Sequence, residues 1–81
     1  MRRDREQVAK AFGLALRAAR EKAGLSQEEL GYRSLVDRTF ISRTESGTRQ
    51  PALTTVFRFA KALGVAPSDL VAITEKHIRK P

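Results

Sequence analysis

Four side chains that can donate hydrogen bonds follow one another at helical spacing in the middle of the chain. They are Arg38, Thr39, Ser42 and Arg43, in a segment expected to be helical over about residues 38–46. At 100° per residue they span about 140° of the helix surface. A guanidinium group can donate two hydrogen bonds to O6 and N7 of guanine, and a hydroxyl group can contact bases or phosphates. The pattern therefore indicates a helix that reads base edges in the major groove of double-stranded DNA. The competing interpretation is an ordinary solvated polar face.

Local signals define this helix and another directly before it. Ser26 and Glu29 form an S-x-x-E capping box, in which each side chain binds a backbone N–H of the first turn. This pattern predicts a helix over about residues 27–34. Asp37 is a second N-cap and Gly47 a left-handed helix stop, so the donor-bearing helix is expected between them.

Apolar residues at helical spacing predict three further helices, over about residues 7–23, 53–63 and 67–78. The core stripe of the first consists of Val8, Phe12, Ala15, Leu16 and Ala19, and that of the second consists of Leu53, Val56, Phe59, Ala60 and Leu63. A glycine follows each of these two helices, and Pro67 starts the last one. Five helices and no strand pattern predict a compact all-α fold.

The chain divides into three parts by composition. Residues 1–6 form a basic N-terminal arm, residues 7–78 the DNA-binding domain, and residues 79–81 a short tail. The arm is charged and lacks an apolar face. Its three arginines could contact phosphate or belong to a disordered tail.

Charge and composition narrow the class of protein. The 81 residues carry a formal charge of +7 with a sequence pI near 10.9, as binding to a polyanion requires. Surface charge that only keeps the chain in solution is the alternative. Without cysteine, and with a single histidine, the chain lacks thiolate and zinc ligand sets, and it has no long apolar run. We expect an intracellular protein with no membrane segment, no metal and no cofactor.

Several motifs agree with one known family at the same time. They are Gly24-Leu25-Ser26-Gln27-Glu28-Glu29-Leu30, Asp37-Arg38-Thr39-Phe40-Ile41-Ser42-Arg43, Glu45 with Gly47, Ala60-Lys61-Ala62-Leu63-Gly64-Val65 and Pro67-Ser68-Asp69-Leu70. With them the chain resembles the repressor and Cro-type helix-turn-helix DNA-binding family, also called xenobiotic-response-element-like. The resemblance implies a lambda-repressor-like five-helix domain with the helix-turn-helix at helices 2 and 3. The compact length and the DRTFIS segment resemble the controller proteins of restriction-modification systems.

The resemblance also assigns roles to residues outside the donor-rich face. Gln27 matches the family position that contacts phosphate, and Ser46 and Arg49 are further phosphate candidates. Arg20 and Glu45 match a structural ion pair between the first helix and the recognition helix. The family commonly dimerises through its last helix and the preceding loop, and we expect Phe57, Val71 and Ile78 at that interface.

Two residues depart from the family pattern. Leu35 stands where many members have glycine, and a bulky residue with positive φ is unusual, so we expect another backbone path there. Thr44 stands where an apolar residue is usual and is expected to weaken the buried face.

The expected function is sequence-specific DNA binding by a homodimer on a palindromic operator, through major-groove readout. Repression needs nothing more, whereas activation would need a contact to RNA polymerase. The alternative is an antitoxin-like module that binds DNA mainly together with a partner protein. We expect no enzymatic activity, because no nucleophile lies beside a base in the sequence pattern.

Overall fold

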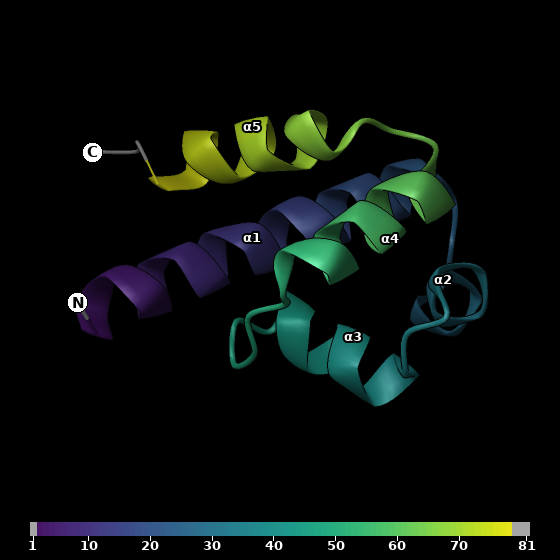
Figure 1. The fold of residues 1–81 in the computed structure, drawn as a ribbon, viewed down its shortest axis with the longest axis horizontal. Helices are drawn as coiled ribbons and strands as arrows, with labels where there is room; N and C mark the ends of the chain where they lie inside the picture. Colours follow the sequence, from purple (N-terminus) through teal and green to yellow (C-terminus); the bar gives the residue numbers. More distant parts are fainter. Residues whose placement is uncertain (1, 79–81) are drawn as a thin grey trace.

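The computed structural model describes residues 2–78, and this part of the chain folds into five α-helices without strands (Figure 1). The helices are α1 (Arg2–Lys22), α2 (Gln27–Ser34), α3 (Arg38–Glu45), α4 (Leu53–Leu63) and α5 (Pro67–Ile78). The predicted all-α fold is confirmed. A helix able to span a membrane is absent from residues 2–78.

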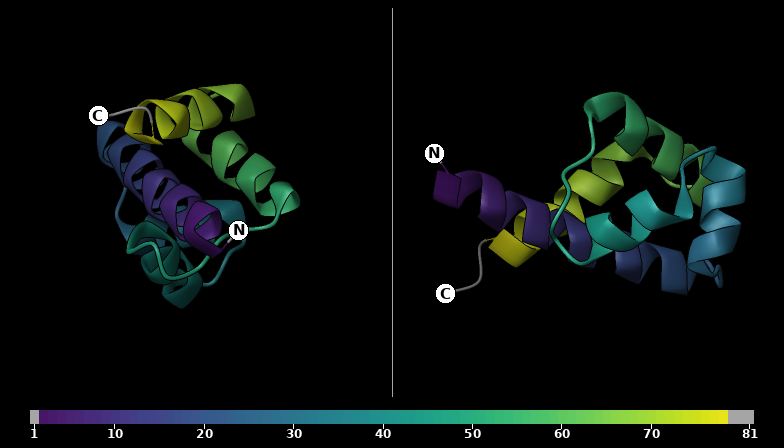
Figure 2. Two further views of the ribbon diagram at one scale, coloured as in Figure 1. Left: turned by 90° about the vertical axis from the view of Figure 1, so that its left-hand side faces the viewer. Right: turned by 90° about the horizontal axis from the view of Figure 1, so that it is seen from below.

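The long helix α1 is the element on which the others are arranged. It lies side by side with α5, and the N-terminal end of α1 and the C-terminal end of α5 lie at the same end of the molecule (Figures 1 and 2). On its other side α1 contacts α3, while α2 contacts both α3 and α4. The helix-turn-helix, α2 and α3, therefore forms one edge of the molecule.

The capping residues place the ends of the helix-turn-helix helices as predicted. The hydroxyl of Ser26 accepts a hydrogen bond from the backbone N–H of Glu29 at 3.0 Å, and the Ser26 N–H donates to the Glu29 carboxylate at 2.8 Å. This donation also lowers the pKa of Glu29. The carboxylate of Asp37 accepts from the N–H of Thr39 at 3.0 Å and caps α3. Only the end of α3 differs by one residue, because Ser46 is its C-cap.

Helix α1 begins earlier than we predicted. Its start was expected at about Gln7, yet the helix begins at Arg2, so residues 2–6 are helical. The prediction relied on apolar periodicity, which those charged residues lack. Asp4 in the first turn is favourable at a helix N-terminus, and the turn that follows supplies the N–H donors for the carbonyl oxygens of residues 2–6. Residue 1 and the predicted tail at 79–81 lie outside the described residues.

The core draws on all five helices. Its buried residues are Phe12, Leu16, Leu30, Ile41, Val56, Phe59, Ala60 and Leu70. The core stripe predicted for α4 contained one error: Leu53 is 69% exposed. It lies in the first turn of α4, next to the Pro51 loop, where the helix is not yet covered by its neighbours.

The turn between α2 and α3 accepts a leucine where glycine is usual. Leu35 has φ 60° and ψ 36°, so the expected alternative backbone path is wrong. A left-handed residue with a Cβ costs roughly 1–2 kcal/mol. The side chain of Leu35 is 82% exposed and so meets no steric obstacle beyond that local strain.

Thr44, which was expected to weaken the buried face, is accommodated there with its hydroxyl group bonded. It is fully buried, and its hydroxyl donates to the carbonyl oxygen of Phe40 at 2.8 Å. Ser34 and Thr74 are buried in the same way, with their hydroxyls bonded to the carbonyls four residues earlier. Because the donor is satisfied within its own helix, each hydroxyl enters the core without an unpaired polar atom.

Helices α1 and α3 approach each other at a glycine. A Cβ atom on Gly13 would lie 2.5 Å from the carbonyl oxygen of Thr44 and 2.7 Å from that of Glu45. Both obstacles are backbone atoms, which cannot move away as a flexible side chain can. Gly13 therefore sets how closely α3 packs on α1.

We predict that Gly13→Ala lowers the free energy of unfolding by about 2 kcal/mol, as overpacking does. Helix propensity alone predicts the opposite sign, a gain of about 1 kcal/mol. Urea unfolding followed by circular dichroism distinguishes the two. Leu14→Ala, at an exposed neighbouring position of α1, is the control and should change stability little. A Gly13→Ala chain as stable as wild type would contradict the close approach.

Candidate nucleic-acid interface

Helix α3 presents the four donor-bearing residues to solvent. Arg38, Thr39, Ser42 and Arg43 are all exposed. The opposite side of α3 is held by Ile41 and Thr44, each fully buried. At eight residues the helix is too short to persist in isolation, so this buried side determines its orientation. The structure thus brings the predicted base-contacting residues together on one accessible face.

The loop after α3 is tied back to the helix. The Ser46 hydroxyl donates to the carbonyl oxygen of Arg43 at 2.9 Å and lies 3.2 Å from the Thr48 hydroxyl. The Thr48 hydroxyl also donates to that carbonyl, at 3.1 Å. The hydroxyl hydrogen of Ser46 is therefore already used, and its backbone N–H donates to the carbonyl oxygen of Ser42. The hydroxyl oxygen can still accept a hydrogen bond. Arg49 is exposed, so its guanidinium group is available to a phosphate.

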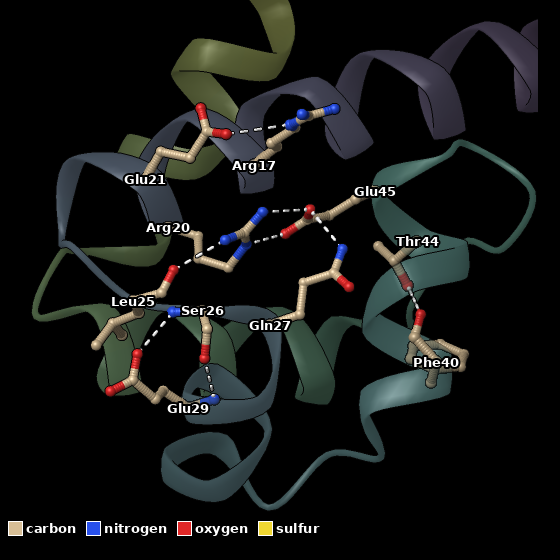
Figure 3. A network of polar contacts seen from close by, with 10 residues as sticks. All are labelled: Arg17, Arg20, Glu21, Leu25, Ser26, Gln27, Glu29, Phe40, Thr44 and Glu45. Carbon is tan, nitrogen blue, oxygen red and sulfur yellow. Dashed lines mark hydrogen bonds and ion pairs between the residues drawn. The ribbon is translucent and has the colours of Figure 1, made fainter.

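A three-residue polar network joins α1, α2 and α3 (Figure 3). Arg20 donates through Nε to one oxygen of the Glu45 carboxylate at 2.7 Å and through Nη2 to the other at 3.0 Å. Its Nη1 donates to the carbonyl oxygen of Leu25 at 2.8 Å. The Gln27 amide donates to Glu45 Oε1 at 3.0 Å. The predicted ion pair is thus present as a two-pronged contact.

The network is nearly withdrawn from solvent. The side chain of Glu45 is 4% exposed and that of Arg20 is 12% exposed. The hydrogen bonds to Glu45 raise the pKa of Arg20, with the negative charge of Glu45 acting in the same direction. In this position the charge of Glu45 is compensated within the protein.

Gln27, which was predicted to contact phosphate, also takes part in this network. Part of its amide is engaged by Glu45, and the residue is half-buried at the first position of α2. Its side chain is thereby held at the rim of a hollow that is also lined by Arg20, Ser26, Glu28 and Arg38. The N-terminus of α2 and the start of α3 thus line the same hollow. The sequence did not predict this proximity, because no local pattern encodes it.

The residues predicted for a dimer interface lie on α4 and α5. Phe57 is 54% exposed and Val71 is 55% exposed, whereas Ile78 is half-buried. Leu53 belongs with them, because it lines one groove together with Val71 and lies one helical turn before Phe57. The i, i+4 spacing of Leu53 and Phe57 was the signal that could have found it.

Among residues 2–78, no three His, Asp or Glu side chains are grouped closely enough to hold a metal ion.

Comparison with known proteins gives consistent matches. Residues 11–72 match the family model described as a helix-turn-helix domain. The control protein C.BamHI of Bacillus amyloliquefaciens is 42% identical over 64 residues, which cover 78% of this chain and 79% of the relative. The restriction-modification controller protein C.AhdI from Aeromonas hydrophila has a similar crystal structure, with a TM-score of 0.75 and 37% identity. That match covers 76% of this chain and 94% of C.AhdI.

A third relative has been solved with DNA. The crystal structure of the restriction-modification controller protein C.Esp1396I as a tetramer in complex with its natural 35-base-pair operator matches with a TM-score of 0.81 and 27% identity. It covers 90% of this chain and 96% of the other.

The buried ion pair should be energetically coupled in a double-mutant cycle. We predict that Glu45→Ala alone lowers the free energy of unfolding by about 3 kcal/mol, because Arg20 is left buried without its partner. The cycle formed with Arg20→Ala should give a coupling energy of about 1–2 kcal/mol, measured by urea unfolding.

The exposed pair of Arg17 and Glu21 provides the matched control. Its atoms are 3.2 Å apart, but its side chains are 62% and 58% exposed, so its coupling should stay below about 0.5 kcal/mol. Equal coupling energies for the two pairs would contradict the structural role of the buried one.

Proposed function

The chain belongs to the helix-turn-helix domain family of DNA-binding transcriptional regulators, and from that premise we propose that it binds double-stranded operator DNA as a homodimer. Each copy would read one half of a palindromic sequence through the major groove. The observation that carries the proposal is the exposed face of α3, with two arginines and two hydroxyl residues opposite a fully buried side.

The chemistry of that face suits base recognition. Arg38 and Arg43 can each donate two hydrogen bonds to a guanine, worth roughly 1–3 kcal/mol of discrimination for a good pair. Thr39 and Ser42 lie between them on the wheel and can contact bases or phosphates, and the Thr39 methyl group suits thymine. The four side chains would thus supply both polar and apolar readout.

Phosphate contacts would fix the position of α3 in the groove. Gln27 lies at the N-terminus of α2, before the recognition helix in the chain, and Arg49 lies in the loop that follows that helix. A helix N-terminus favours an anion, and the Gln27 amide adds a donor there. Ser46 would act mainly by holding the loop, since its hydroxyl is already bonded to Arg43.

A dimer would bring two copies of α3 onto one operator. We assign its interface to the exposed apolar residues of α4 and α5, Leu53, Phe57 and Val71, with Ile78 at the edge. These three apolar side chains are more than half exposed, and Leu53 neighbours both of the others, lining a groove with Val71 and lying one turn before Phe57. Such a surface favours burial against a second copy. Two-fold symmetry with recognition helices about 34 Å apart matches half-sites one helical turn apart.

The relatives support a role in control of restriction-modification genes. C.BamHI is named as a control protein, C.AhdI as a restriction-modification controller protein, and C.Esp1396I binds its operator as a tetramer. Repression by occupying the operator requires no further contact, whereas activation would add RNA polymerase as a partner. The chain would act in the bacterial cytoplasm, without a catalytic activity or a cofactor of its own.

An antitoxin-like protein module remains the second candidate. The exposed apolar surface on α4 and α5 that suits a second copy could instead receive a different protein. Tight sequence-specific binding by the purified chain alone would favour the regulator, and binding only in the presence of a partner would favour the module.

Arg43→Ala should weaken binding to the preferred operator by about 1–3 kcal/mol per half-site and relax selection at one base pair in each half. The operator is first selected from random duplex DNA, and affinity is then measured by fluorescence anisotropy at fixed salt. Lys76→Ala removes the same charge from α5, which lies across α1 from α3, and should preserve the selection. Unchanged base preference in Arg43→Ala would remove Arg43 from the readout.

Phe57→Ser should shift the chain toward monomer. Phe57 is 54% exposed in one copy, so covering the rest contributes about 1 kcal/mol per copy. A dimer contains two copies, so its dissociation constant should rise on the order of 30-fold. Sedimentation velocity over a concentration series measures the shift. Leu14→Ser, at a residue 51% exposed on α1, is the control for removal of an exposed apolar side chain. Equal association of wild type and Phe57→Ser would place the interface elsewhere.

A further inference from the structure

The first turn of α1 carries positive charges that the helix itself does not favour. Arg3 and Arg5 lie there, both exposed, at the end where the helix dipole attracts anions and repels cations. Asp4 is the acidic residue of that turn. Since local helix stability gives no reason for the two arginines, their charge suits a partner outside the helix.

The geometry places this end of α1 beside the loop that follows the recognition helix. One turn before Gly13, the side chain of Lys10 packs on Gly47 of that loop. A Cβ atom on Gly47 would lie only 2.8 Å from Lys10 Cγ. Arg5, Glu6 and Ala9 line one wall of a hollow whose opposite wall is the loop from Gly47 to Ala52. At 1.5 Å per residue, Arg3 lies about 15 Å along the axis from Gly13.

The basic side chains of this end flank the side of α1 that faces α3 and the loop after it. Measured around the axis from Gly13, Lys10 lies at about 60° and Arg3 at about 80°. Arg5 lies at about 80° in the opposite sense, and Glu6, at about 20°, lowers the local charge without cancelling it. The N-terminal end of α1 projects past α3 (Figures 1 and 2). On the side toward the α3–α4 loop, three basic side chains and Glu6 leave a surplus of positive charge.

We propose that Arg3, Arg5 and Lys10, the α1 basic patch, bind phosphates of the duplex that flanks each half-site, outside the base pairs read by α3. This inference rests on the proposed function. The loop that separates α3 from the patch carries Arg49, the phosphate candidate at the edge of the half-site. Duplex DNA carries one charge per about 1.7 Å of its axis, so a backbone that passes Arg49 continues alongside the patch. Such contacts add affinity and no sequence preference.

The test compares two duplexes. One ends at the outermost base pair of the selected operator, and the other is extended at each end by about one helical turn of unrelated sequence, roughly 10 base pairs. Wild type should bind the longer duplex about tenfold more tightly at moderate salt, because the extra phosphate contacts release counterions.

Arg3→Gln with Arg5→Gln should bind both duplexes with nearly equal affinity. Its salt dependence on the long duplex, plotted as the logarithm of affinity against that of salt concentration, should be shallower by about 1 for each phosphate that the variant no longer neutralises. Lys10 is kept because its stem packs on Gly47. The charge-matched control, Lys22→Gln with Lys76→Gln, should keep the wild-type difference between the duplexes.

Three results would overturn the inference. The first is a patch variant that keeps the full preference for the long duplex, and the second is a control variant in which that preference disappears equally. In both cases sequence-specific binding would persist and the proposed function would stand. The third is a wild-type chain that selects no sequence, which would overturn the proposed function together with the patch.

Discussion

The carboxylate at the C-terminal end of α3 is neutralised by the two helices packed against it. Glu45 stands at this end, where the helix dipole already disfavours a negative charge. Arg20 of α1 and Gln27 of α2 both bond to it, and the side chain of Glu45 is 4% exposed. One buried contact therefore removes a repulsive charge and joins three helices. It adds a polar tie to the apolar packing of Ile41 that holds α3 in place.

The packing around this contact follows from the same need to hold a short helix. Gly13 allows the backbones of α1 and α3 to approach, and Thr44 fills the core while its hydroxyl bonds within α3. Polar residues at core positions are tolerated here because each one is satisfied locally. The result is a recognition helix fixed by its inner side, with an outer side free to meet a ligand.

The sequence predicted best what short-range chemistry determines. The capping residues Ser26 and Asp37 located α2 and α3 to within one residue, and the motif resemblance paired Arg20 with Glu45 across 25 positions. Apolar periodicity failed at the ends of helices, where it missed the charged start of α1 and assigned the exposed Leu53 to the core. The left-handed Leu35 was missed because the turn keeps this conformation at the cost of local backbone strain, which the exposed side chain does not add to. Base contacts and the dimer interface depend on a second molecule and stay predictions.

The central claim is that two copies of α3 read one operator from the major groove. Methylation interference at guanine N7 tests it most directly, because that atom lies in the major groove and accepts from arginine. On the selected operator, we expect methylation to block binding at guanines in two symmetry-related clusters about one helical turn apart. Binding that is indifferent to N7 methylation, or sensitive in a single unpaired cluster, would contradict the account.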